Sequence, residues 1–259
     1  MKRCLVYIAF LLIHDAVYAQ TFEVATVKPS TLDVSAGRFM RMQTANQFLA
    51  RNYPPRILIS AAFNLSPQAI TGGPEWIDSD RYEIVAKTPG DVRPTLDEQM
   101  AMLRKLLAER FGLTIHRAPK ELPIYSITIA KNGLVMKEST VSPDATPEGP
   151  PPLVFVIYPM EVVKLPGRSA TVGELASVMQ RAALDRPVVD KTGLSRRYDF
   201  DLEFAPDENV FGGTVPRSID TTRPGLFTAL QEQLGLKLEA TRGLVDAIVI
   251  DKIERPSDN

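Results

Sequence analysis

The stretch LLAERFGLTIHRAPKELPIYSITIAK, residues 106–131, is nearly restated by ALQEQLGLKLEATRGLVDAIVIDK, residues 229–252. In each copy a helical pattern stops at a glycine, Gly112 or Gly235, a residue that suits the left-handed backbone closing a helix. The residues after each glycine alternate between apolar and polar, as β-strands do. The doubled phrase therefore predicts a duplicated unit of helix, glycine stop and β-hairpin.

The first copy opens with a helix-start signal. Thr95 and Glu98 have the spacing of a capping box, in which both side chains satisfy free backbone N–H groups. After Gly112 we expect a strand over residues 113–117, a short connection, and a second strand over residues 124–130. The helix itself is predicted from the spacing of Leu96, Met100, Leu103, Leu106, Leu107 and Phe111.

The second copy repeats this order. Pro224 suits the first turn of a helix whose apolar stripe ends at Leu234. We then expect a strand over residues 236–241, a tight turn at Arg242-Gly243 and a return strand over residues 245–253.

Further similarity lies upstream of each copy. Arg81-Tyr82 and Arg197-Tyr198 each start a predicted strand, and helical patterns precede them over residues 45–63 and 172–184. Thr171 opens the second pattern, with Glu174 three residues on. We therefore predict an α+β fold of two similar halves. Each half is a small mixed or antiparallel sheet covered by two helices, in the order β-α-β-β-α-β-β.

The first residues have the layout of a secretory signal. Lys2 and Arg3 precede an apolar run over residues 5–13, and small residues before Gln20 suit a cleavage site. We predict a signal peptide over 1–19, an α+β half over 20–138, a proline-rich linker or loop over 139–152 and a second half over 153–259. The alternative for the first segment is an uncleaved anchor.

Export sets the expected compartment and chemistry. The single cysteine, Cys4, lies in the signal, so the mature chain would fold without disulfides. We expect an exported protein, periplasmic or extracellular, with no membrane span after signal cleavage. Lys plus Arg number 30 against 31 Asp plus Glu, so the charge does not favour nucleic acid or an anionic membrane.

Residues for common catalytic sites are scarce. His116 is the one histidine of the predicted mature chain, and its counterpart in the second copy is Glu239, which indicates a solvated strand face. Serine acyl-enzyme signatures are missing, and one histidine without cysteine cannot build a zinc site. We therefore predict no catalytic residue and no cofactor.

One acidic pattern leaves a metal alternative open. Asp199, Asp201 and Glu203 alternate with apolar residues and so share one strand face. Calcium would relieve their mutual repulsion, but a solvated outer face is the favoured interpretation, because no glycine-bearing calcium loop accompanies the acids.

The candidate binding residues are Trp76 and the two Arg-Tyr pairs, Arg81, Tyr82, Arg197 and Tyr198. Trp76 is the only tryptophan, and it suits either a partner-binding anchor or an aromatic plug of the core. The nearby Asp78 and Asp80 are expected to fix a turn and not to act as a catalytic pair.

Several strings carry a resemblance to a known family. They are FEVATVKPS (22–30), ITGGPEWIDSDRYEIVAK (70–87), LLAERFGLTIHR (106–117), LPIYSITIAKNG (122–133), DKTGLSRRYDFDLEF (190–204) and the stretch from residue 226 onward. The chain resembles a domain-of-unknown-function family of exported bacterial proteins, expanded in soil Acidobacteria. The resemblance implies export, and some relatives are joined to a membrane-embedded metallopeptidase-like sensor module. Residues 171–204 and 226–251 are also similar to the short N-terminal docking modules of secretins and TonB-dependent receptors.

The expected function is non-catalytic docking or sensing in the bacterial cell envelope, with an envelope or extracellular protein as partner. Exposed strand edges are the expected contact surface, because their unpaired backbone groups can accept another strand. Two alternatives stay open. One is an extracytoplasmic hydrolase using Asp199 and Asp201, with or without calcium, and the other is a regulatory or inhibitory domain of an envelope peptidase.

Overall fold

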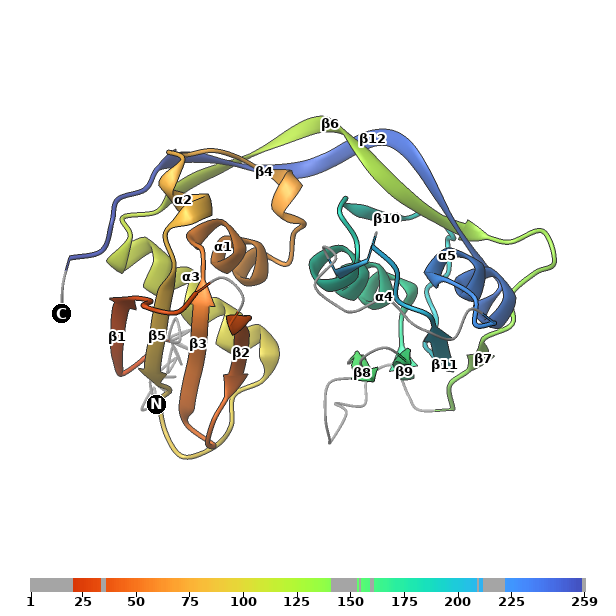
Figure 1. The fold of residues 1–259 in the computed structure, drawn as a ribbon, viewed down its shortest axis with the longest axis horizontal. Helices are drawn as coiled ribbons and strands as arrows, with labels where there is room; N and C mark the ends of the chain where they lie inside the picture. The colour runs from red at the N-terminus through yellow and green to blue at the C-terminus, as the bar shows by residue number, and fades with distance from the viewer. Residues whose placement is uncertain are drawn as a thin grey trace, which may run out of the picture.

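The computed structural model describes residues 21–33, 36–140, 153, 155–158, 161–208, 210–211 and 222–257. The predicted signal peptide and all but two residues of the predicted linker lie outside the described residues. The described elements form two lobes beneath an arch of two long strands (Figure 1). The predicted α+β class is confirmed.

Lobe 1 contains an antiparallel sheet in the order β1 (Val24–Pro29), β5 (Tyr82–Lys87), β3 (Gln47–Tyr53) and β2 (Phe39–Met42). One face of this sheet packs against α1 (Pro55–Phe63) and α3 (Leu96–Arg110), and the short α2 (Trp76–Ser79) precedes β5. A single turn of 3₁₀ helix, Pro67–Ala69, leads into β4 (Ile70–Gly72). The core joins side chains of the sheet and both helices, among them Phe48, Ile84, Leu58, Leu103 and Leu107.

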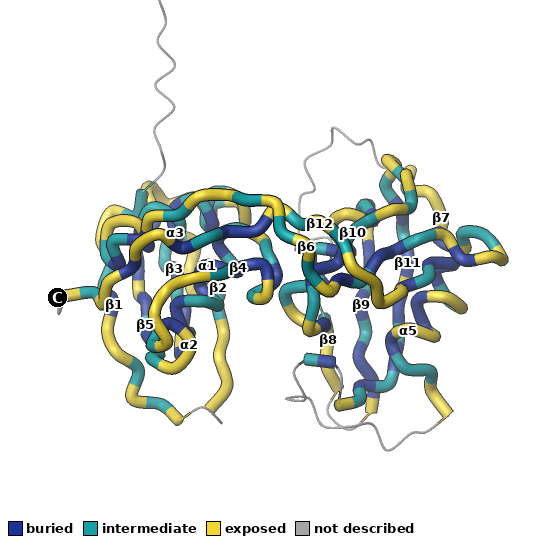
Figure 2. Tube along the Cα trace, turned by 90° about the horizontal axis from the view of Figure 1, so that it is seen from above, coloured by how far each residue is buried: buried dark blue, intermediate teal, exposed yellow. Residues whose placement is uncertain are grey.

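Lobe 2 contains a sheet with the corresponding strand order. Its strands are β7 (Lys137–Glu138), β11 (Tyr198–Phe204), β9 (Val162–Ala170) and β8 (Val156–Tyr158). The helical segments are α4 (Val172–Val178), which continues as the π turn Met179–Ala183, and α5 (Leu226–Ala229), which continues as the π turn Leu230–Leu234. Figure 2 shows that the buried segments gather within the two lobes.

A third sheet, which we call the arch sheet, joins the lobes. Its order is β10 (Val188–Asp190), β6 (Thr114–Ile129), β12 (Leu236–Lys252) and β4. The long strands β6 and β12 pair antiparallel along the whole arch, β4 runs parallel to the end of β12, and β10 runs parallel to the end of β6. Each lobe is thus completed by a strand from the other half of the chain.

The predicted hairpins are therefore wrong. Pro119, in the predicted first connection, pairs with Asp246, and Gly243, in the predicted second turn, pairs with Leu122. Both strands continue straight through these positions. The physical gain is burial in the opposite lobe, because Ile248 joins the lobe 1 core and Ile127 joins the lobe 2 core.

The predicted helix ends are mostly confirmed. Thr95 and Thr171 each head a complete capping box. Gly112 and Gly235 adopt φ of 57° and 70°, the left-handed backbone expected of helix stops.

The helix predicted over residues 45–63 is wrong in its first part and confirmed in its second. Residues 47–53 of the predicted 45–63 helix form β3, whose alternate residues Phe48 and Ala50 are buried. The helix begins only at Pro55, because proline fits a first helical turn but cannot donate a backbone bond inside a helix. The helix predicted over 172–184 is α4 followed by a π turn.

Candidate functional site

A surface groove of about 530 Å³ lies at the junction of β1, α2 and β5 in lobe 1. It brings together three of the five candidate binding residues, since Arg81 and Tyr82 line it and Trp76 lies beneath the lining residue Arg255. The other lining residues are Pro29, Ser30, Leu32, Asp33, Ser79 and Asp80.

Arg255 fastens the segment after β12 to this groove. Its guanidinium lies 4.8 Å from the centre of the Trp76 ring, and its Nε donates to Asp80 Oδ2 at 2.8 Å. The neighbouring Glu254 N–H donates to the Phe111 carbonyl at 2.7 Å. Trp76 is half-buried and packs against the lobe 1 core, so it combines the core role with a surface stacking role.

Sequence reasoning missed Arg255, because its partner Asp80 is 175 positions away and no local pattern links them. Asp78 forms a two-pronged ion pair with Arg56, at 2.6 and 3.0 Å, which holds α2 against α1. Asp78 and Asp80 thus form ion pairs with arginines distant in the sequence, which connect α2 to α1 and to the segment after β12.

Within the first Arg-Tyr pair, the arginine supports the backbone. Arg81 Nη1 donates to the carbonyl of Asn52, a buried residue with a left-handed φ of 63°. Tyr82 is 4% exposed and meets the Phe111 ring edge-on at 5.2 Å. Burial, and then the charge of Asp80, raise the pKa of the Tyr82 hydroxyl.

In lobe 2 the second pair repeats this arrangement. Arg197 Nη1 donates at 2.6 Å to the carbonyl of Ser169, which is buried and has a left-handed φ of 51°. Arg197 also contacts Glu174 at 3.3 Å, and Tyr198 is buried. Both arginines therefore stabilise a strained residue just before a helix, and the second pair does not join the groove.

The three candidate calcium ligands each contact a donor. Tyr198, Phe200, Leu202 and Phe204 point into the core, and the acids lie on the opposite strand face. Asp199 accepts from the Ser169 N–H at 2.7 Å, Asp201 pairs with Arg168 at 2.7 Å, and Glu203 pairs with Lys164 at 2.5 Å and Arg223 at 3.2 Å. The described residues contain no group of three or more His, Cys, Asp or Glu side chains placed to hold a metal ion.

His116 lies on the exposed side of the arch, where its Nδ1 is 2.8 Å from Asp251 Oδ1. Its counterpart Glu239 pairs with Lys237 at 2.5 Å. Polar pairs at both positions agree with a solvated strand face.

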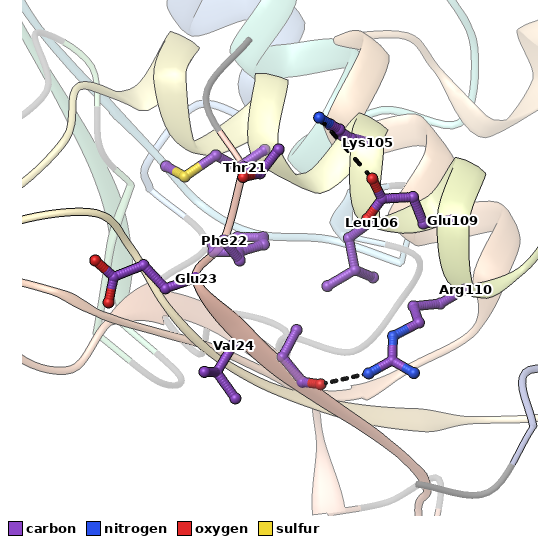
Figure 3. A pocket seen from close by; sticks show the side chains of 10 residues that line it. Thr21, Phe22, Glu23, Val24, Lys105, Leu106, Glu109 and Arg110 are labelled. Atoms are coloured by element: carbon purple, nitrogen blue, oxygen red, sulfur yellow. Dashed lines mark hydrogen bonds and ion pairs between the residues drawn. The ribbon is translucent and has the colours of Figure 1, made fainter. Parts of the chain in front are cut away.

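A second cavity, of about 320 Å³, lies between the segment that leads into β1 and helix α3 (Figure 3). Phe22, Met102 and Leu106 supply its apolar walls, while Lys105 and Glu109 supply charges at its rim. The Arg110 guanidinium donates to the Ala25 carbonyl at 2.8 Å and ties the two walls together.

A family model described as "Protein of unknown function (DUF3738)" matches residues 56–253. The chain belongs to this family. The matched span includes both long strands, so the arch lies within the DUF3738 domain. Searches of curated proteins and of solved structures give no match. Among the described residues, no helix is both long enough and apolar enough to cross a membrane.

In this DUF3738 protein, an exposed apolar strand stands at the margin of lobe 2. Strand β8 is the outermost described strand of its sheet, and Val156, Ile157 and Tyr158 are 40%, 39% and 44% exposed. The corresponding strand of lobe 1, β2, carries the exposed Phe39, but Arg41 lies over that ring at 5.0 Å. The β8 edge is therefore the more apolar of the two.

Proposed function

We propose that this protein is an exported, non-catalytic docking module of the bacterial cell envelope, which binds a protein partner through the edge of lobe 2. The observation that carries the proposal is β8, whose three consecutive large apolar side chains are each about two-fifths exposed. Export is supported by the signal pattern over residues 1–19.

The chemistry of β8 suits strand addition. An outermost strand presents backbone N–H and C=O groups to an incoming strand, and natural sheets commonly protect such edges with lysine or proline. The three residues of β8 include neither. An added strand would gain backbone hydrogen bonds along the edge and would cover Val156 and Tyr158 on one face and Ile157 on the other.

The carboxylate-dependent hydrolase has less support. Asp201 and Glu203 are engaged in ion pairs with basic side chains, and Asp199 accepts from a backbone N–H. In each case the carboxylate is engaged in a contact that stabilises lobe 2. A general acid would instead need an environment that raises the pKa of its carboxyl, whereas Lys164 lowers the pKa of Glu203.

In-cell crosslinking tests the docking proposal. A photo-crosslinking residue at position 157 should yield one discrete crosslinked protein in the envelope fraction. The same residue at Val92, which is 82% exposed between β5 and α3, is the matched control and should yield none. With the crosslinker kept at position 157, Val156→Lys should abolish capture, because a lysine on an edge strand disfavours pairing with another strand.

Equal crosslinking from both positions, or none from position 157, would refute docking at β8. Export has its own readout. Sequencing the first residues of the protein from the envelope or the medium should give a start at Gln20, and recovery only from the cytoplasm would refute export.

A further inference from the structure

Lobe 1 is completed by a segment that arrives from the other lobe. This exchange arm comprises residues 247–255, the last part of β12 and the three residues after it (Figure 1). It lies between β4 and the first part of β6, since Ile248 pairs with Ile70 in parallel and with Arg117 in antiparallel fashion. We call the space between these two strands the arm slot.

The arm fits its slot through buried side chains and specific contacts. Ala247 and Ile248 are fully buried, and Ile250 and Ile253 are nearly so. At Gly72 a Cβ would lie 2.9 Å from the Ile250 carbonyl oxygen, so only glycine permits this close approach. Beyond the strand, Arg255 supplies the contacts to Trp76 and Asp80 described above. The slot is thus shaped for this sequence.

The connection between the arm and lobe 2 is largely exposed and lies within β12, where it pairs with residues 119–123 of β6. It consists of residues 242–246, where Leu244 is 72% exposed and where the sequence itself has a turn signal at Arg242-Gly243. Outside the arch sheet, the described side-chain hydrogen bonds between the lobes all involve Asn64, which contacts Ser177 at 3.2 Å and Gln180 at 3.1 Å. Besides the contacts of the arm itself, an arm is kept in its own lobe by the pairing of residues 242–246 with residues 119–123, the Arg242–Glu121 ion pair and the Asn64 contacts.

We propose that a second copy of this chain is a partner for the arm slot, and that two copies form a dimer by exchanging residues 247–255. Every contact of the arm is kept in such a dimer, because the slot of each copy has the same sequence. The exchange changes the path of residues 242–246, their pairing with residues 119–123, the Arg242–Glu121 ion pair and the Asn64 contacts. The balance between the two forms is set by concentration, since an arm tethered to its own slot has an effective concentration in the mM range. This inference does not rest on the docking function of β8.

Two engineered cysteine pairs distinguish a dimer formed by arm exchange from a dimer formed in another way. Both pairs are introduced into a chain whose Cys4 is replaced by serine. His116→Cys with Val249→Cys places one thiol on the slot and one on the arm, at directly opposite positions. Thr128→Cys with Lys237→Cys is the matched control. These positions are also directly opposite each other, but both lie in lobe 2, and Lys237 precedes the connection at residues 242–246. Cβ atoms of opposite residues are about 5 Å apart, within reach of a short thiol crosslinker.

The chains are unfolded, refolded at about 1 mM or at a thousandfold lower concentration, and crosslinked. At the high concentration we expect the arm pair to link two chains and the control pair to link within one chain. At the low concentration both pairs should link within one chain. Monomers under both conditions, dimers in which both pairs link within one chain, or dimers in which both pairs link two chains would each overturn arm exchange at residues 242–246.

The unsubstituted chain provides a check that does not depend on the variants. Light scattering after refolding should give a severalfold larger dimer fraction at the high concentration. The emission of Trp76, the only tryptophan, should be the same in monomer and dimer, because Arg255 covers the ring in both. A dimer with altered Trp76 emission would show an unseated arm and would contradict the proposal.

Discussion

Replacing Ile248 by alanine should destabilise lobe 1, although Ile248 belongs to the second half of the chain. The side chain is fully buried in the core that also contains Leu103 and Leu107 of α3. A hairpin closed within the second half would instead place Ile248 in lobe 2. The location of the damage therefore tests the crossing of the strands.

The expected magnitude follows from burial. Truncating a fully buried isoleucine to alanine costs about 2–5 kcal/mol, the lost transfer free energy plus the cost of the cavity. Since 1.4 kcal/mol corresponds to a factor of ten, backbone amides of lobe 1 that exchange by unfolding of the lobe should exchange roughly 30- to 4,000-fold faster.

Hydrogen exchange followed by mass spectrometry reads the two lobes separately. In Ile248→Ala, peptides from α3 (Leu96–Arg110) should lose protection more than those from α4 (Val172–Val178). Ile127→Ala is the matched control, because Ile127 is 1% exposed in the lobe 2 core and should give the opposite pattern. If Ile248→Ala weakened α4 and spared α3, the exchanged topology would be wrong.

Three further outcomes are expected. Thr95→Ala removes a helix cap and should lower the free energy of unfolding, measured with urea, by about 1 kcal/mol; no change would contradict the capping box. The Lys164 hydrogen bond lowers the pKa of Glu203, so the stability that this pair supplies is present above the ordinary value of 4.5 and is lost as the pH falls below it. Thermal melts from pH 6 to 3 should show a weaker pH dependence in Lys164→Met, and an identical dependence would refute the pairing. Arg255→Ala should shift Trp76 emission to longer wavelength, because the ring loses its covering cation, whereas unchanged emission would contradict the stacking.

Local chemistry made much of each lobe predictable. The capping boxes at Thr95 and Thr171 and the glycine stops at Gly112 and Gly235 depend on neighbouring residues, and all four are present as expected. The alternation over residues 198–204 likewise placed the aromatic side chains of β11 in the core. The strand at 47–53 was predicted as helix because its apolar residues also fit a helical spacing, and the two prolines that follow it mark the true start of α1.

The crossing of the strands could not be predicted in the same way. Residues 124–130 and 247–253 show a similar alternation of apolar and polar residues. The strand that follows each glycine stop can therefore pair equally well with either segment, and local sequence does not decide between them. Turn residues such as Pro119 and Gly243 favoured a hairpin, yet in the structure they lie within the exposed middle of a continuous ribbon. The choice depends on packing between distant segments. The Arg255–Trp76 contact, which completes the groove, depends on the same crossing.

The two lobes share a scaffold but differ in what they leave open. Arg81 and Arg197 perform the same task, each holding the carbonyl of a left-handed residue, so the Arg-Tyr pairs account for structure in both lobes. In lobe 1 the exchange arm covers Trp76 and lies between β4 and the first part of β6 in the arch sheet. In lobe 2 the apolar strand β8 stays exposed at the sheet margin. A partner strand can therefore add to lobe 2 without displacing any part of the arch, whereas binding in the arm slot of lobe 1 requires the arm to leave. This difference is the reason we propose docking at lobe 2 and self-exchange at lobe 1.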